Sequence, residues 1–162
     1  MNSPFVNLFY ALQAQIQSLV PAIRWIDQEM GQLEHYTERP PVSWPCVLID
    51  FDGWSFENMG RNCQTAEGDI ILRLGFAPFS YSNQLSPVKD AALAFYDVEF
   101  SLHQALHDWQ PGGFSHLTRL TANTEKRHDA IRVRMLRYHT AFEDYSTQPV
   151  TTPASPNAVF NI

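Results

Sequence analysis

The stretch PPVSWPCVLIDFDGW, residues 40–54, determines how the rest of the chain is interpreted. Three prolines lead into a short apolar run, residues 46–49, and an acidic segment that ends in glycine follows it. An apolar run of this length between proline and glycine is typical of a buried strand. We therefore expect a core strand from Cys46 to about Phe51, then an acidic turn, and then a connection over residues 53–66.

A helix is predicted before this strand, because apolar residues recur there every three or four positions. Ser3 can cap this helix, Pro4 suits its first turn, and Pro21 ends it. The apolar stripe consists of Phe5, Phe9, Leu12, Ile16 and Leu19. A short strand is expected around residues 23–26, and an exposed loop over residues 34–41.

A second strand and a long helix are predicted after the acidic segment. Apolar and other residues alternate from Asp69 to Phe76, which is typical of a half-buried strand. Ser86 can cap the helix, Pro87 suits its first turn, and Pro111 lies just beyond its end. The apolar positions of the helix are Val88, Ala91, Phe95, Val98, Leu102, Ala105 and Trp109.

Two further strands, residues 114–122 and 130–142, are expected to close the domain around a polar turn. In the last strand the alternation changes phase at Met135 and Leu136, which are adjacent and both apolar. Such a phase change indicates a β-bulge.

The order helix, strands, helix, strands predicts an α+β fold. We expect a mostly antiparallel β-sheet packed by the N-terminal helix and one long central helix. A single domain is expected over residues 1–145. Residues 146–162 are expected to form an extended tail that orders only in an assembly, because the tail has too little apolar content to fold alone.

The composition narrows the classes of partner. A formal net charge of -6 argues against general affinity for nucleic acid, since that affinity comes from clustered Lys and Arg. Five basic residues nevertheless fall close together and are interpreted as the solvated face of one strand. They are Lys126, Arg127, Arg132, Arg134 and Arg137. The 11 Phe, 6 Tyr and 4 Trp exceed what a core of this size needs, so we expect some of them at a partner-facing surface.

The sequence shows no signal peptide, no membrane-spanning run and no disulfide or metal pattern of cysteines. The segment MNSPFVNLFY has neither the basic region nor the cleavage site of a signal peptide. No apolar run approaches the ~20 residues that span a bilayer, so we expect a soluble protein with no membrane partner. Cys46 and Cys63 do not have metal-ligand spacing and do not make a disulfide framework.

The strand ending in Asp50-Phe51-Asp52-Gly53 resembles the first motif of haloacid-dehalogenase-type phosphohydrolases. The resemblance implies that Asp50 is a nucleophile, that Asp52 is the acid/base, and that Mg²⁺ bridges to a phosphate. Two carboxylates at a strand end can hold such a cation. The rest of the pattern is missing, since Trp54 and Ser55 stand where that family has Thr and an apolar residue. A small Mg²⁺-dependent phosphohydrolase is therefore the alternative function, and a strand that runs into an acidic turn is the simpler interpretation.

No other catalytic or metal-binding pattern stands out. His103 and His107 share one face of the predicted helix. They have no Glu between them and no evident third ligand for zinc. We expect no catalytic residue, no metal and no cofactor.

The layout of the chain resembles the tail terminator and minor-tail (head–tail joining) proteins of tailed phages and related particles. The resemblance covers about residues 1–145. It is carried by the helix Phe5 to Leu19, by Ile23-Arg24-Trp25-Ile26-Asp27 with Met30-Gly31-Gln32-Leu33, by Pro41 to Ile49, by the strand Asp69 to Leu74, by the long helix, and by Leu117 to Arg137.

This resemblance implies a structural virion protein and not an enzyme. Such proteins form a hexameric ring at the head-proximal end of the tail tube, and they assemble in the host cytoplasm. The ring stops tube growth and contacts the tail tube protein and the head–tail connector. DNA passes through its lumen without specific binding.

Subunit contacts take the place of an active site in this interpretation. The residues interpreted as interface residues are Asp50, Asp52, Trp54, Arg132, Arg134, Arg137 and Phe160. We expect the arginines to face a neighbouring acidic subunit, because a lumen that gripped phosphates would impede DNA ejection. The tail that carries Phe160 can add to the sheet of a neighbour.

Overall fold

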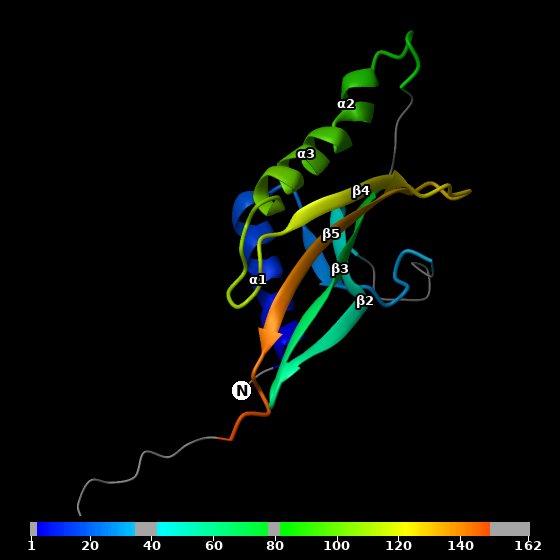
Figure 1. The fold of residues 1–162 in the computed structure, drawn as a ribbon. Helices are drawn as coiled ribbons and strands as arrows, with labels where there is room; N and C mark the ends of the chain where they lie inside the picture. The colour runs from blue at the N-terminus through cyan, green and yellow to red at the C-terminus, as the bar shows by residue number, and fades with distance from the viewer. Residues whose placement is uncertain (1–2, 35–41, 78–81, 150–162) are drawn as a thin grey trace, which may run out of the picture.

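A five-stranded sheet forms the centre of the molecule, in the order β1-β2-β3-β5-β4. The computed structural model describes residues 3–34, 42–77 and 82–149. The strands are Trp25–Gln28 (β1), Cys46–Gly60 (β2), Cys63–Phe76 (β3), Thr118–Thr124 (β4) and Arg132–Asp144 (β5), and the helices are Pro4–Leu19 (α1), Lys89–Leu93 (α2) and Phe95–Leu106 (α3). β1 runs parallel to β2, and the other neighbours are antiparallel. The predicted α+β class, with a mostly antiparallel sheet packed by helices, is confirmed (Figure 1).

β2 and β3 form a long antiparallel hairpin, so the predicted acidic turn and the connection over residues 53–66 are wrong. β2 continues to Gly60, and the turn uses Gly60 and Asn62, whose φ angles are 147° and 58°. The register shifts after Asp52, where Gly53, with a φ of 64°, supplies the left-handed conformation of a β-bulge. The last six residues of β2 are all exposed, so no apolar alternation marks them as a strand.

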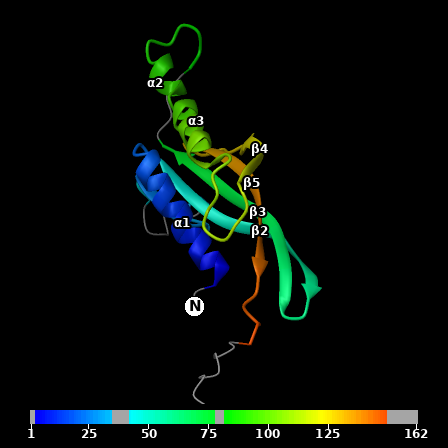
Figure 2. The same cartoon turned by 60° about the vertical axis from the view of Figure 1, so that its left-hand side comes forward.

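α1 and α3 cover one face of the sheet, which we call the helical face (Figures 1 and 2). The Nε2 of Gln15 donates a hydrogen bond to the carbonyl oxygen of Ala105 at 2.9 Å, which joins the two helices. The buried positions of α1 recur at every fourth residue and continue to Val20, so the predicted place of Leu19 in the stripe is wrong. Ser3 makes no side-chain capping bond. The core under the helices includes Leu8, Leu12, Ile16, Val47, Ile49, Ile70, Leu72, Leu74, Leu102, Leu106, Leu136 and Tyr138.

A smaller apolar cluster lies on the opposite face of the sheet, which we call the open face. Its members are Leu33, Val42, Cys46, Leu48, Ile131 and Val133. Because alternate residues of a strand point to opposite faces, residues 46–49 serve both clusters and are all buried. The same reason accounts for the phase change in β5, where Val133 faces the small cluster and Leu136 the main core.

The β-bulge predicted at Met135 and Leu136 is therefore wrong. The pairing of β5 with β3 runs without a shift of register from one end to the other. The irregularity lies instead in the neighbouring strand β4, between Arg119 and Thr121.

The central helix is divided in two and is shorter than the predicted span from Ser86 to Trp109. α3 ends at Leu106, where the chain turns to pair with another segment. The backbone N–H of Asp108 donates to the carbonyl of Leu117 at 2.8 Å, and the N–H of Leu117 donates to the carbonyl of Trp109 at 2.9 Å. These bonds take the place of further helical turns.

β4 begins later than predicted and forms one edge of the sheet. The strand expected over residues 114–122 lies at Thr118–Thr124, and Phe114 makes only an isolated bridge to Phe142. At one end of the molecule α2 projects beyond the sheet, and the tip of the β2–β3 hairpin and the start of α1 lie toward the other end (Figure 2). Helix α2 and the first turn of α1 thus lie at opposite ends of the molecule.

Candidate interaction surfaces

The two carboxylates of the acidic segment lie within β2 and not at its end. Asp50 is opposite Ile71 and Asp52 is opposite Asp69 in the antiparallel ladder. Alternation places both carboxylates on the open face, and both are exposed. The strand-end geometry expected for a phosphohydrolase motif is therefore wrong, because the chain continues as a strand past both carboxylates. In residues 3–34, 42–77 and 82–149, no three His, Cys, Asp or Glu side chains are grouped so as to hold a metal ion.

The structure brings Asp52 close to Arg137 on the open face. The Nη2 of Arg137 lies 4.0 Å from Oδ2 of Asp52, and its Nη1 lies 2.9 Å from Oδ2 of Asp69. The Nδ1 of His139 lies 2.9 Å from the other oxygen of Asp69. Arg137 is thus paired within its own chain, although 38% of its side chain stays exposed.

Arg132 and Arg134 lie on the helical face, below α3. The guanidinium of Arg134 binds both oxygens of Glu99, at 2.5 and 2.9 Å, and Glu99 is 7% exposed. The guanidinium of Arg132 lies 4.4 Å from the ring centroid of Phe95, and its Nη2 donates to the hydroxyl of Tyr96 at 3.3 Å. The three arginines of β5 therefore do not form one solvated strip, because they point to both faces and bind groups within the chain.

The bulge in β2 turns Trp54 toward the helical face. Its ring packs at centroid distances of 4.9 Å from Phe5, 6.3 Å from Phe114 and 5.6 Å from Phe142. A Cβ atom on Gly68 would lie 2.5 Å from the indole ring, so Gly68 leaves the space that the ring occupies. Trp54 thus belongs mainly to the core. Phe160 lies outside the described residues.

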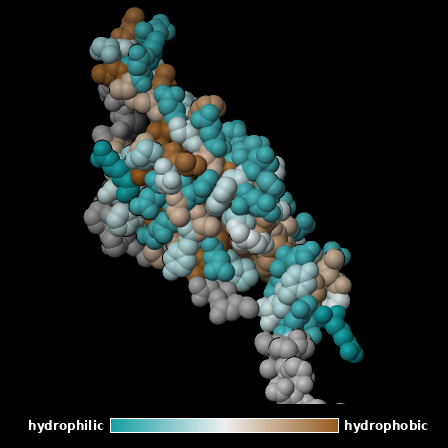
Figure 3. Space-filling view, turned by 90° about the vertical axis from the view of Figure 1, so that its left-hand side faces the viewer, coloured by the Kyte–Doolittle hydropathy of each residue, from teal (hydrophilic) through white to brown (hydrophobic). Residues whose placement is uncertain are grey.

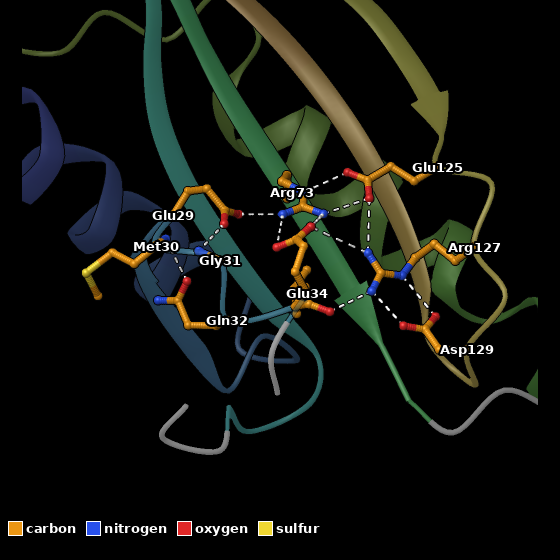
Figure 4. Close-up of polar contacts among 10 residues, drawn as sticks. Glu29, Met30, Gly31, Gln32, Glu34, Arg73, Glu125, Arg127 and Asp129 are labelled. Carbon is orange, nitrogen blue, oxygen red and sulfur yellow. Dashed lines mark hydrogen bonds and ion pairs between the residues drawn. The ribbon is translucent and has the colours of Figure 1, made fainter. Parts of the chain in front are cut away.

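The open face carries an ionic network around Arg73 that the sequence did not predict. The side chain of Arg73 is 12% exposed, and it reaches three carboxylates (Figure 4). Its Nη1 lies 2.9 Å from Glu29, its Nη2 lies 2.5 Å from Glu34, and its Nε lies 2.6 Å from Glu125. These carboxylates come from the segment after β1 and from the β4–β5 connection. Arg73 therefore ties two distant loops to the middle of the sheet.

Arg127 extends this network toward the β4–β5 connection (Figure 4). Its guanidinium lies 2.6 Å from Asp129 and 3.4 Å from Glu125, and it donates to the carbonyl of Leu33 at 2.5 Å. Hydrogen bonds from Arg73 lower the pKa of Glu34, and hydrogen bonds from Arg127 lower the pKa of Asp129. The carboxylates are thus held in their charged form, which suits a structural clamp.

Burial suppresses the reactivity of Cys46 below this network. The thiol is fully buried, and burial raises its pKa to about 12. Since the thiolate is the reactive form, Cys46 acts as a small core residue.

His103 of α3 and His107, directly after the end of α3, lie close to β4. The rings of His103 and His107 are 4.9 Å apart at their centroids, and the Nδ1 of His107 accepts a hydrogen bond from the backbone of Arg119 at 3.3 Å. Partial burial lowers the pKa of His103, and the charge of Arg119 adds to this effect.

An apolar ridge runs along the outer side of α2 and α3. It is formed by Lys89, Leu93, Tyr96 and Phe100, which are spaced by four, three and four residues and so share one face. The three apolar members are 40%, 45% and 60% exposed. Apolar surface is also visible at the projecting end of the molecule (Figure 3), where Leu85 and Val88 are 85% and 46% exposed. We call the four residues the α2–α3 ridge.

A groove of about 280 Å³ lies between α1 and β1, toward the other end of the helical layer. Its lining consists of Phe5, Val6, Phe9, Tyr10, Asp27, Gln28 and Phe51. α1 contains no charged residue in its 16 positions, although Val6 and Tyr10 are 41% and 59% exposed. Depletion of charge together with exposed aromatics is typical of the core of a protein interface. We call this hollow the α1–β1 groove.

Within the described residues, no helix combines the length and apolar character needed to cross a membrane. No protein-family model matches the chain, and no curated protein matches it in sequence. Among solved structures, the chain is similar to one from the virion of a native gene transfer agent (GTA) particle. The two chains are 13% identical with a TM-score of 0.48, and the match covers 84% of this chain and 94% of the other.

Proposed function

We propose that this protein is a structural subunit of a phage-like virion, and that it forms a ring at the head-proximal end of the tail tube. In this role it ends tube growth as a tail terminator or joins the tube to the head–tail connector. The observation that carries the proposal is the pair of exposed apolar surfaces, the α2–α3 ridge and the α1–β1 groove, at separated ends of the helical layer. A monomeric protein rarely leaves such patches uncovered.

The layout on which the sequence resemblance rests supports the same role. Helix α1, strand β1, the core strand from Cys46 and the strands β3 and β5 form in the regions where the sequence predicted a helix and strands. The resemblance covers residues 1–145, which we propose to be the folded domain. The tail over residues 146–162 is proposed to order on a neighbouring subunit or partner, where Phe160 supplies an apolar contact.

The open face is proposed as a second contact surface. Asp50 and Asp52 are exposed there, and Arg137 is partly exposed beside them. This polar face suits the rim of an interface better than its centre, since rims are polar and solvated. Arg132 and Arg134 bind groups in their own chain and contribute by supporting α3. With a net charge of -6, the ring is proposed to let DNA pass without specific binding.

The test is assembly of the full chain, alone and with tail tube protein and connector. We expect native mass spectrometry to show a hexamer, and negative-stain images to show a six-fold ring at one end of each tube. Tubes assembled with the protein should have a defined end to which the connector binds. A protein that stays monomeric at all concentrations and never binds tubes would overturn the proposal.

A further inference from the structure

A hollow of about 580 Å³ lies close to the point where the described chain ends. Its walls come from the start of α1, from the loop after α3 and from the end of β5. The start of α1 and the end of β5 lie toward the same end of the molecule (Figure 2). The apolar residues on these walls are Pro4, Phe114, Phe142 and Tyr145, and Gly112 leaves part of one wall without a side chain. We call this hollow the α1–β5 groove.

Contacts within the subunit hold the walls of this groove in place. The rings of Phe114 and Phe142 are 4.9 Å apart at their centroids, and the same two residues form a backbone bridge between the loop and β5. The Nε2 of Gln110 donates to the carbonyl of Phe114 at 2.9 Å. A preformed apolar groove suits the insertion of an apolar side chain, since the walls lose little conformational freedom on binding.

Among the described residues, the charged ones that line the groove are Glu143 and Asp144, and both already have partners. Asp144 accepts hydrogen bonds from Nε2 of Gln64 at 3.0 Å and from the backbone N–H of Ser146 at 2.8 Å. Glu143 accepts one from the hydroxyl of Tyr145. These carboxylates therefore need no cation from an occupant, and the apolar walls favour an uncharged segment.

The tail that follows β5 has this character. Residues 146–162 contain no charged side chain, and their apolar members include Val159, Phe160 and Ile162. The described chain ends at residue 149, shortly after Tyr145 and Ser146, which line the groove. Every subunit therefore carries one groove and, starting at its edge, one segment whose composition suits such a groove.

The length and the prolines of the tail favour the groove of a neighbour over that of its own subunit. Pro149, Pro153 and Pro156 recur every three or four residues, and proline-rich segments extend by about 3.1 Å per residue. From Pro149 to Phe160 is 11 residues, which corresponds to about 34 Å, close to the diameter of a small domain. An extended segment of this length takes Phe160 away from the groove beside which it starts and brings it to an adjacent subunit.

We propose that the tail of one subunit binds the α1–β5 groove of the next, with Phe160 in contact with Phe114 and Tyr145 of that neighbour. The proposal rests on the ring function proposed above and specifies how the subunits are joined. A tail that fits a groove at a different place on an identical molecule makes a head-to-tail contact. Repeated contacts of this kind close into a ring when the rotation permits.

Substitutions on both sides of the contact test it in the full chain. Phe160→Ser removes the apolar group of the tail, and Asn7→Trp places a large ring at the groove from an exposed position of α1. Each is expected to weaken association about tenfold or more by analytical ultracentrifugation. Asn157→Ser in the tail and Gln17→Trp, at an exposed position of α1 outside the groove, are the matched controls. Both should associate within about twofold of the wild type. Circular dichroism confirms that each variant is folded.

Disulfide trapping distinguishes the groove of a neighbour from that of the same chain. All chains carry Cys63→Ser, so that the buried Cys46 is the one native cysteine left. Chains with Asn7→Cys are mixed with chains with Phe160→Cys and oxidised. A covalent dimer is expected at several-fold higher yield than when Gln17→Cys replaces Asn7→Cys. A chain that carries both new cysteines should give a ladder of covalent multimers, and a single chain closed on itself would overturn the proposal.

The outcomes separate this proposal from the ring function. Rings that form equally well with Phe160→Ser and Asn7→Trp, without a covalent dimer on trapping, would overturn the docking of tail into groove and leave the ring function standing. A loss of association with Asn7→Trp but not with Phe160→Ser would show that another segment occupies the groove, and it would also overturn the docking. A wild-type chain that stays monomeric alone and on tail tubes would overturn both proposals.

Discussion

The Arg73 network and the α2–α3 ridge both lie near the surface. They differ in whether their side chains have partners within the chain. Around Arg73, every guanidinium nitrogen has a carboxylate partner within the chain. Along the ridge, the side chains of Leu93, Tyr96 and Phe100 remain 40%, 45% and 60% exposed. The contrast is consistent with a structural role for the Arg73 network and with the partner contact proposed above for the ridge.

The largest effect on stability is expected when Arg73 is replaced. Arg73→Ala leaves Glu29, Glu34 and Glu125 close together without their shared cation. We expect the free energy of unfolding to fall by about 3–5 kcal/mol, the range for breaking a buried ion pair from one side. Urea denaturation measures the change. Arg137→Ala is the matched control on the same face, and its more exposed side chain should cost less than about 1 kcal/mol.

A comparable loss for Arg73→Ala and Arg137→Ala would contradict the structural role of the network. It would indicate that water replaces Arg73 as readily as it replaces an exposed arginine.

The second largest effect on stability is expected for the Glu99–Arg134 ion pair below the ridge. Glu99→Leu leaves the partly buried guanidinium of Arg134 without its partner and is expected to cost about 2–4 kcal/mol. The double variant Glu99→Leu/Arg134→Leu removes both charges and should be more stable than Glu99→Leu alone. Thermal denaturation of both variants and of the wild type completes the comparison. Equal losses in the single and double variants would show that shape, and not charge pairing, holds α3 here.

Acid pH is expected to weaken the Arg73 network. The pKa values of Glu34 and Asp129 are lowered in the folded chain, so their contribution to stability is full above the unfolded values and lost as pH falls through the folded ones. Starting from ordinary values of 4.5 and 3.8, stability should decline below about pH 4.5. Because both side chains are partly exposed to solvent, we expect the loss to be about 1 kcal/mol or less. Urea midpoints between pH 7 and pH 3 measure it, and Glu34→Gln should flatten the profile.

The smallest effect on stability is expected on the ridge itself. Phe100→Ser changes an exposed side chain, so the free energy of unfolding should stay within about 0.5 kcal/mol of the wild type. Association measured by ultracentrifugation should nevertheless weaken. A large loss of stability would show that Phe100 belongs to the core of the subunit, which would remove the contrast between the two regions.

Local sequence patterns were sufficient to predict the elements in which buried residues recur at regular intervals. The inner half of β3 alternates between Ile70, Leu72 and Leu74 on the helical face and Arg73 on the other, and this alternation is legible from the sequence. α1 was recognised in the same way. The outer half of the β2–β3 hairpin was missed, because its exposed residues carry no alternation and Gly53 looked like the end of the strand.

The Arg73 network could not be predicted, since its carboxylates come from segments 39 to 52 residues away along the chain. Arg127 and Arg134 looked alike in sequence as members of one basic strip. Arg127 binds carboxylates on the open face because it lies in the β4–β5 connection. Arg134 binds Glu99 under α3 because it lies on the helical face of β5.

The sequence by itself determined the α+β class, the position of the core strand that starts at Cys46, and the placement of α1, because these depend on apolar periodicity within a few residues. Only the tertiary structure decided that the acidic segment continues as a strand, that its carboxylates lie on the open face, and that Arg127, Arg132, Arg134 and Arg137 bind groups within the chain. It also decided that the ridge and the groove lie at separate ends of the helical layer. These features depend on which segments the sheet brings together across its width, and side chains that meet in this way leave no local pattern along the chain.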